Sequence, residues 1–150
     1  MTEELGKQAV EFTTNLLELA GFSLEAATEE TEEGLRVVIT GDDVPLLLGH
    51  NAELLNAFEY LCNRVLVSGD AGNKIIFDSN GYRALREKEL RMMAQKAAEK
   101  VKSSGVPFSF DPMSPSERRI VHLALVDDKM VHTESHGGGH DRKVTIYRVK

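Results

Sequence analysis

The sequence has one cysteine and no long apolar run, and both absences limit what the protein can be. Cys62 is the only cysteine among 150 residues, so an internal disulfide is excluded. It follows Leu61 on an apolar helix face, where a buried and inert thiol fits better than a nucleophile. No apolar run approaches the roughly 18 residues that a membrane span needs. We therefore expect no membrane insertion.

Signals for export, catalysis and cofactors are also lacking. The acidic, polar start at Met1–Leu5 does not fit a secretory signal, so we expect a cytoplasmic protein. The segment from Ser68 to Asn73 lacks the residue order of a phosphate-binding loop, and we interpret it as a turn. No nucleophile–base–acid set, paired-carboxylate motif or dinucleotide fingerprint is found. We expect no catalytic residues and no cofactor.

Three histidines are spaced four residues apart, at His132, His136 and His140. On a helix this spacing would indicate a metal site. The glycine triplet at 137–139 makes a helix there improbable, so we expect no metal. Imidazoles in a flexible loop next to Arg142 fit polar contacts to a nucleic acid, or no function at all.

The charge is unevenly distributed along the chain. Residues 1–82 hold 4 basic and 15 acidic residues, a net charge of −11. Residues 83–150 hold 14 basic and 9 acidic residues, a net charge of +5. An anionic partner is therefore expected to meet the second half, although solvated lysines on a helix would produce the same asymmetry.

Apolar periodicity predicts an α+β fold in two parts. The first, residues 1–80, is expected to follow the order α-β-β-α-α-β. Leu35, Val37 and Ile39 alternate inward in one strand, and Thr31–Gly34 connects it to the strand before. The expected elements of this part are a helix ending at Gly21, strands at 24–28 and 35–40, a short apolar segment at 44–48, a helix at 52–67 and a strand at 74–78.

The second part, residues 81–150, is expected to follow the order α-β-α-β-β. Its predicted elements are a long helix at 83–102, an alternating strand at 106–110, a helix at 115–126 and strands at 131–135 and 143–149. Two helices carry long apolar stripes. In the helix at 52–67 the stripe is Leu54, Leu55, Phe58, Leu61, Cys62, Val65 and Leu66. In the helix at 83–102 it is Leu90, Met93, Ala94, Ala97, Ala98 and Val101.

The helix at 115–126 has an unusually complete start. Ser114 can cap free N–H groups, Pro115 suits the first helical position, and Glu117 closes a capping box. With Arg118 at zero, His122 lies at roughly 40° and Arg119 at roughly 100° around the helix. The broad apolar arc opposite them holds Ile120, Val121, Leu123, Ala124 and Leu125.

The resulting cationic wedge of Arg118, His122 and Arg119 suits a phosphate. An arginine offers a planar fork of donors, and an imidazole one turn away can add a donor or stack on a base. The alternative is that Arg118 and His122 pair with neighbouring carboxylates or only cover the surface. The Arg-x-x-x-His spacing alone leaves both interpretations open.

Several motifs in order carry a family resemblance. These are Gly81-Tyr82-Arg83, Ala97–Val101, Met113–Leu125, the strand and glycine-rich loop after it, and Asp141–Ile146. Together they resemble the single-strand nucleic-acid-binding domain named for an arginine and a histidine separated by three residues (R-three-H). From about Leu35 to Lys150 the chain is similar to the bacterial Jag (SpoIIIJ-associated) family, which joins a K-homology (KH) domain to that domain.

The resemblance implies single-stranded RNA or single-stranded DNA as partner, and roles in cell elongation, cell division or sporulation. Arg118 and His122 would be the signature pair, with Arg119, Arg142 and Lys143 as supporting contacts. The family also commonly carries a small N-terminal domain. We expect no room for it here, because the sequence starts almost directly at the K-homology helix.

The first half departs from the family at the Gly-x-x-Gly loop, with which K-homology domains clamp four nucleotides. The loop here is Gly49-His50-Asn51-Ala52, where alanine replaces the second glycine and basic residues are absent. The acidic surroundings would repel a polyanion. We expect a degenerate module that serves as a scaffold or contacts a protein, although Gly49, His50 and Asn51 could still donate to a base or phosphate.

Two functions therefore follow from the sequence. The first is a non-catalytic RNA-binding protein, acting as a post-transcriptional or cell-envelope-linked regulator. The alternative is a protein–protein adaptor whose nucleic-acid surface has decayed and whose acidic half recruits a partner.

Overall fold

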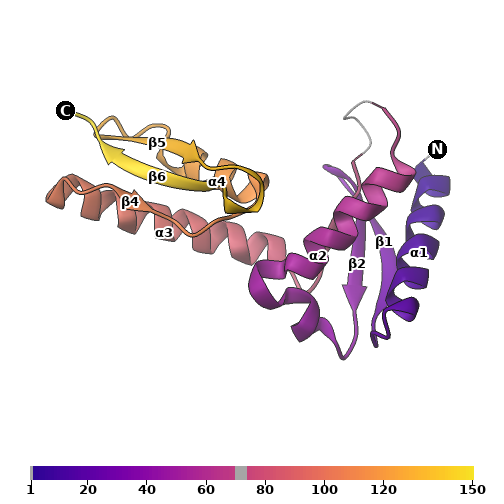
Figure 1. Cartoon of the computed structure of the whole chain (residues 1–150). Helices are drawn as coiled ribbons and strands as arrows, with labels where there is room; N and C mark the ends of the chain where they lie inside the picture. Colours follow the sequence, from indigo (N-terminus) through magenta and orange to yellow (C-terminus); the bar gives the residue numbers. More distant parts are fainter. Residues whose placement is uncertain (1, 70–73) are drawn as a thin grey trace. The chain divides into compact units, whose positions relative to one another are not determined.

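The computed structural model describes residues 2–69 and 74–150 (Figure 1). They form two compact units, residues 1–83 and residues 84–150. Helices and small sheets occur in both, so the α+β class is confirmed. Most of the turn expected at 68–73 lies outside the described residues.

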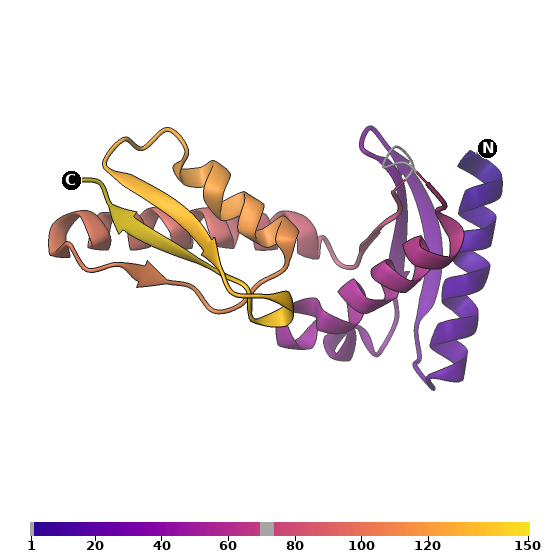
Figure 2. The ribbon, with the colours of Figure 1, turned by 45° about the horizontal axis from the view of Figure 1, so that its top comes forward.

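The first unit places two helices on one face of a three-stranded sheet (Figures 1 and 2). Strands β1 and β2 are antiparallel, and β3 pairs with β2 in parallel. The predicted hairpin is confirmed, because Thr31 pairs with Gly34 across a two-residue connection. The elements are α1 (Thr2–Leu19), β1 (Glu25–Thr31), β2 (Gly34–Thr40), α2 (Val44–Leu66) and β3 (Ile76–Asp78).

Helix α2 consists of two helical segments that meet at Gly49–Ala52, where the backbone leaves the helical conformation. This agrees with two consecutive helices in the predicted order. The predicted stripe on the second segment was too wide. Its buried apolar line contains Leu55, Phe58 and Cys62, whereas Leu54, Leu61 and Val65 are exposed. A three-stranded sheet that α1 also covers leaves α2 only a narrow face to bury.

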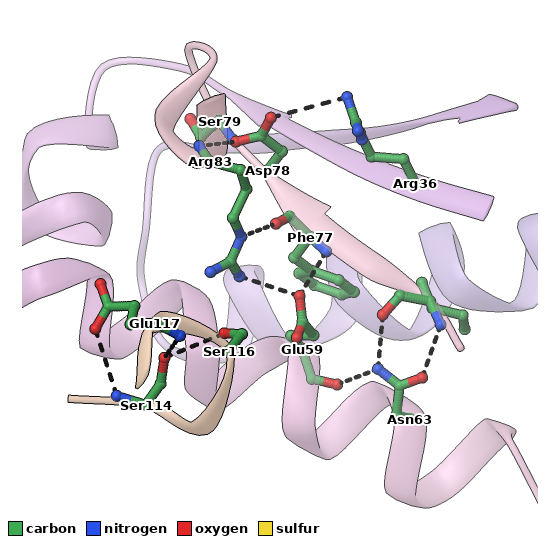
Figure 3. Close-up of polar contacts among 11 residues, drawn as sticks. Arg36, Glu59, Asn63, Phe77, Asp78, Ser79, Arg83, Ser114, Ser116 and Glu117 are labelled. Atoms are coloured by element: carbon green, nitrogen blue, oxygen red, sulfur yellow. Dashed lines mark hydrogen bonds and ion pairs between the residues drawn. The ribbon is translucent and has the colours of Figure 1, made fainter. Parts of the chain in front are cut away.

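Side chains of α2 form hydrogen bonds with the edge of β3 that faces away from β2 (Figure 3). Asn63 Nδ2 donates to Ile75 O at 2.7 Å, and Ile75 N donates to Asn63 Oδ1 at 2.8 Å. Glu59 Oε2 accepts from Phe77 N at 2.9 Å and from Arg83 Nη2 at 3.0 Å. These polar residues therefore provide β3 with the partners that another strand would otherwise supply.

The second unit follows the predicted α-β-α-β-β order. Its antiparallel sheet has the strand order β4-β6-β5, and α4 lies next to β5 (Figure 2). A short 3₁₀ helix, Gly139–Asp141, connects β5 to β6. The elements are α3 (Tyr82–Ser104), β4 (Phe108–Ser109), α4 (Pro115–Leu125), β5 (Val131–His136) and β6 (Lys143–Arg148).

The core of this unit joins α3, α4 and one face of the sheet. The predicted stripe of α3 is buried except at Met93, which is 45% exposed. The strand expected at 106–110 is shorter than predicted. Val106 is exposed, and only Phe108 and Ser109 pair with β6. The core contains Leu90, Ala94, Ala97, Ala98, Val101, Phe110, Val121, Leu125, Val131, Val144 and Ile146.

Candidate nucleic-acid interface

The start of α4 has the predicted capping box (Figure 3). Ser114 Oγ accepts from Glu117 N at 3.3 Å, and Glu117 Oε2 accepts from Ser114 N at 3.4 Å. Pro115 occupies the first turn, where a missing N–H costs nothing. Local contacts of the capping box therefore help to set the phase of α4.

Glu117 has a second partner that the sequence pattern did not reveal. Its Oε1 accepts from Arg86 Nε on α3 at 2.8 Å, and the side chains of Glu117 and Arg86 are 9% and 17% exposed. Capping residues are usually local in their effect, but this one also ties α4 to α3. The only sequence signal for it was a glutamate on the same helical face as Val121 and Leu125.

The faces of α4 differ in part from the sequence-based prediction. The buried line consists of Glu117, Val121 and Leu125. Arg118 and His122 lie on one flank of it and are half-buried, while Arg119 is exposed. Leu123, placed in the apolar arc by its type, is 49% exposed. The arc is narrower than predicted only at Leu123, because Ile120 and Ala124 are partly buried against the core beside Val121 and Leu125.

Arg118 is held by the turn that precedes its own helix. Its Nη1 donates to the carbonyl oxygen of Met113 at 2.9 Å. The backbone N–H of Met113 in turn donates to the carbonyl oxygen of Arg142, just before β6, at 3.2 Å. Met113 therefore brings Arg118 and Arg142, 24 residues apart in the sequence, to one place. A guanidinium has five donors, so this contact leaves Arg118 most of its hydrogen-bonding capacity.

His122 contacts β5 through both ring nitrogens. Nδ1 is hydrogen-bonded to Thr133 Oγ1, and Nε2 is hydrogen-bonded to Ser135 Oγ at 2.9 Å. Thr133 and Ser135 are two residues apart and so share one face of the strand. Burial lowers the pKa of His122, and the nearby charge of Arg118 lowers this pKa further. The ring is thus neutral near pH 7, with one nitrogen donating and the other accepting.

The remaining predicted contacts lie around the start of β6. Arg142 Nη1 donates to Gly137 O at 2.8 Å, which folds its side chain back on the glycine-rich loop. Lys143 pairs with His136 across β5 and β6. The structure therefore places the Arg118 guanidinium next to the backbone of Arg142 through Met113, and it holds His122 on β5. It shows no hydrogen bond from the side chain of Arg119 or Lys143 within residues 2–69 and 74–150.

The three histidines of the second unit occupy two kinds of structure. His132 and His136 lie on β5, on the face opposite to Thr133 and Ser135, and only His140 is in the loop, within the 3₁₀ helix. The predicted strand at 131–135 already contained His132, so the expectation of a loop was wrong only for His136, the last residue of β5. Among the described residues, no group of three or more histidines, cysteines or carboxylates is placed to hold a metal ion.

In the first unit, the loop at Gly49–Ala52 keeps the backbone shape of a glycine-rich turn. His50, Asn51 and Ala52 have φ values of 53°, 58° and 58°, in the left-handed region that glycine favours. Gly49 has an ordinary φ of −63°, and a Cβ added there would meet no atom within 4 Å. Alanine at position 52 therefore changes the residue type of the turn without removing the turn.

The thiol of Cys62 and the character of the helices also bear on function. Cys62 is fully buried, and burial raises the pKa of its thiol to about 11, as expected for an inert thiol. Within the described ranges, none of the helices has the length and apolar character that crossing a bilayer requires.

The second unit matches a known domain family. Residues 88–148 match the family of R-three-H domains. The second unit is an R-three-H domain. Over 147 residues, 96% of this chain and 66% of the relative, the chain is 33% identical to RNA-binding protein KhpB of Clostridium symbiosum. It is 29% identical to RNA-binding protein KhpB of Bacillus subtilis over 144 residues, 93% of this chain and 69% of the relative.

A more distant relative is RNA-binding protein KhpB of Streptococcus pneumoniae, 21% identical over 145 residues. That alignment covers 96% of this chain and 44% of the relative. The chain thus spans about two thirds of the first two relatives and less than half of the third. In the R-three-H domain, Arg118 and His122 occupy the Arg-x-x-x-His spacing within the matched residues.

Proposed function

We propose that the chain is a non-catalytic protein that binds single-stranded RNA through the R-three-H domain. The observation that carries the proposal is the position of Arg118, whose guanidinium is held by Met113 O beside the backbone of Arg142, which Met113 N contacts. Guanidinium groups bind phosphate oxygens with paired, charge-assisted hydrogen bonds. The exposed Arg119 and the nearby Lys143 add sequence-independent attraction to the phosphate backbone. Single-stranded DNA would satisfy the same contacts with phosphate.

His122 has a positioning role in this proposal. Its ring nitrogens are engaged by two hydroxyls of β5, so it fixes the flank of α4 from which Arg118 extends. A neutral ring adds little attraction for phosphate, and its contribution to RNA is a donor or a stacking surface. The names of the relatives, RNA-binding protein KhpB, support RNA as the partner.

We propose further that residues 1–80 form a K-homology-like domain with a degenerate loop, and that residues 81–150 form the nucleic-acid-binding domain. The element order and the turn at Gly49–Ala52 support the first assignment. Residues 1–83 hold 5 basic and 15 acidic residues, and this charge opposes an RNA backbone. In this proposal His50 and Asn51 contribute weakly, and the protein acts as a post-transcriptional or cell-envelope, cell-division or sporulation-linked regulator in the cytoplasm.

The experiment is a salt titration of the full chain with a short single-stranded RNA. Affinity should fall linearly with the logarithm of salt concentration, because bound phosphates release counterions. In Arg118→Ala the Kd should rise by about tenfold. The slope of the logarithm of affinity against the logarithm of salt concentration, called the salt slope below, should fall by the amount that corresponds to about one phosphate contact. Arg118→Lys keeps the charge but loses the fork, so it should weaken binding while preserving most of the slope.

Arg91→Ala is the matched control, because Arg91 is an exposed arginine of α3 that pairs with Glu87. It removes one positive charge from the same unit and should change Kd by less than about twofold. Equal effects of Arg118→Ala and Arg91→Ala would contradict a specific role for α4. Such a result would mean that RNA binding depends only on the overall positive charge of the second unit.

The alternative function is a protein–protein adaptor with a decayed nucleic-acid surface. The strongly acidic first unit favours it, because such a surface suits a basic protein partner. The same titration separates the two functions. An adaptor should show no salt-dependent RNA binding at micromolar protein concentration, and Arg118→Ala should have no effect.

A further inference from the structure

The outer face of the β4-β6-β5 sheet carries a cluster of rings next to Lys143, which is the cross-strand partner of His136. Val144 and Ile146 of β6 point into the core, so Tyr147 points outward. His132 is its cross-strand partner on β5, and Glu134 and His136 follow on the same face. We call His132, Glu134, His136 and Tyr147 the outer-face cluster.

The rings of this cluster are already ordered with respect to one another. His132 and Tyr147 are stacked, with centroids 5.2 Å apart and an interplanar angle of 18°. His136 meets Tyr147 edge-on at 85°, and its Nε2 is hydrogen-bonded to the Tyr147 hydroxyl at 2.9 Å. Glu134 Oε1 lies 3.5 Å from His132 Nε2, and Glu134 Oε2 lies 3.3 Å from His136 Nε2. Ordering the rings in advance lowers the entropy cost of binding a planar ligand.

The stack has one open end. Tyr147 lies on the central strand, and His132 lies on β5, which is an edge strand. Because the two rings stack across the strands, the far face of His132 points past the open edge of the sheet. The side chain of His132 is half exposed, which leaves this face accessible.

Strand β5 also connects the stack to the flank of α4. Thr133 and Ser135 hold His122 on one side of β5, while His132 and His136 lie on the other side. Arg118 lies near the end of β5 that holds His136, and His132 lies at the other end of this strand. A nucleic-acid strand whose phosphates lie at Arg118 therefore has to pass around the edge strand β5 and along it, over several nucleotides, for a base to reach His132.

We propose that the His132–Tyr147 stack is a base-stacking site for single-stranded RNA, which deepens and rests on the proposed RNA-binding function. A planar base adds to the open face of His132 and extends the stack by one ring. The carboxylate of Glu134, between the two histidines, opposes a phosphate there and can accept a hydrogen bond from a base amino group. The rings and Glu134 therefore favour the base of the nucleotide, while Arg118 on α4 and Lys143, at the His136 end of the outer face, favour the phosphate.

The first experiment compares His132→Ala with His132→Phe in the full chain, using a fluorescein-labelled single-stranded RNA. Loss of the ring should weaken binding about five- to a hundredfold, the range for one stacked base. His132→Phe keeps an aromatic ring and should retain most of the affinity. The salt slope should be the same in both variants, because no phosphate contact is removed.

A ribose–phosphate oligomer of the same length without bases is the second ligand. Wild-type protein should bind it more weakly than RNA, and His132→Ala should bind it as well as wild type does. If His132→Ala and wild type bind RNA equally, the stacking site is overturned while RNA binding by α4 stands. If wild type binds no RNA, the proposed function itself fails.

A third measurement reads the stack directly and does not depend on the stability of the alanine variant. The chain has no tryptophan, so Tyr147→Trp introduces a single fluorophore into the outer-face cluster. RNA should quench its fluorescence, and the oligomer without bases should not. The matched control is Tyr60→Trp, at an exposed tyrosine of α2. Equal quenching at positions 60 and 147, or none at 147, would contradict the proposal.

Discussion

At the scale of single residues, Arg118 and His122 have different surroundings. Arg118 uses one donor for Met113, whereas His122 has both ring nitrogens engaged by β5. The sequence predicted their shared flank correctly from the helix phase. It could not predict the partners of His122, because Thr133 and Ser135 become its neighbours only when α4 packs on the sheet.

The neutral state of His122 predicts a pH dependence of stability. Burial and Arg118 lower its pKa below the ordinary value of 6.5, so the unfolded chain takes up a proton at higher pH than the folded chain. The contribution of His122 to the free energy of unfolding is therefore fully present above about pH 6.5, and it is lost as the pH falls below that value. Urea unfolding at pH 8, 7, 6 and 5 should show this loss in wild type.

His122→Gln is the control for this pH dependence, because it cannot be protonated in this range but can still hydrogen-bond the two hydroxyls. The difference in unfolding free energy between wild type and His122→Gln should shrink as the pH falls from 7 to 5. A difference that stays constant with pH would contradict a neutral, half-buried ring.

Cys62 offers a chemical test of the first unit. A buried thiol with a pKa of about 11 has almost no thiolate at pH 8, and a maleimide cannot reach it. We expect negligible labelling of the folded protein over an hour, and complete labelling in denaturant, both measured by mass spectrometry. Rapid labelling of the native chain would mean that α2 separates readily from the sheet.

At the scale of elements, the patterns identified the order of helices and strands, but they overestimated how much of each helix is buried. Leu54, Leu61, Met93 and Leu123 share the apolar character of their buried neighbours, yet all are exposed. Periodicity reports the centre of a buried face, whereas its width depends on the size of the surface opposite. Each unit here has only a three-stranded sheet, so its helices bury narrow lines of residues.

The start of α4 predicts a stability effect with two separable parts. Glu117→Ala removes the reciprocal cap and also leaves the mostly buried Arg86 without this carboxylate. It should destabilise the R-three-H domain by about 3 kcal/mol. Glu117→Gln can still close the capping box, so it should lose only the part that depends on charge. Thermal unfolding of both variants measures the part that comes from the cap and the part that comes from the charge. Equal losses of stability in Glu117→Ala and Glu117→Gln would show that the capping hydrogen bonds contribute nothing.

The loop at Gly49–Ala52 predicts how little the first unit contributes to RNA affinity. An aspartate fits at position 49, since the φ of Gly49 is ordinary and the space beside it is open. Gly49→Asp should therefore fold normally and raise the Kd for RNA by less than about threefold, against about tenfold for Arg118→Ala. Loss of RNA binding in folded Gly49→Asp would show that the loop is an active clamp.

At the scale of the whole molecule, the two units differ in charge and therefore in expected partner. Residues 84–150 hold 13 basic and 9 acidic residues, while residues 1–83 are strongly acidic. This asymmetry was visible in the sequence, and so was the change of pattern near residue 81. The outer-face cluster was not, because the pairing of His132 with Tyr147 depends on the register between β5 and β6.

The charge asymmetry predicts where RNA crosslinks. Ultraviolet crosslinking of the full chain to single-stranded RNA, followed by peptide mass spectrometry, should give adducts mainly in residues 84–150. Peptides covering residues 113–148 should dominate, because α4, β5 and β6 lie there. Adducts concentrated at residues 44–66 would contradict the assignment of RNA binding to the second unit.

The contacts of Glu59 and Asn63 with β3 also bear on the behaviour of the chain at high concentration. An exposed strand edge is a template on which a second chain can add a strand and start an aggregate. The N–H of Phe77 on β3, and the backbone groups of Ile75 just before this strand, are already bonded to α2 side chains. The opposite edge, β1, presents exposed glutamates that repel a second copy of itself. Both margins of the first sheet are thus closed to fibril growth, one by hydrogen bonds and the other by charge.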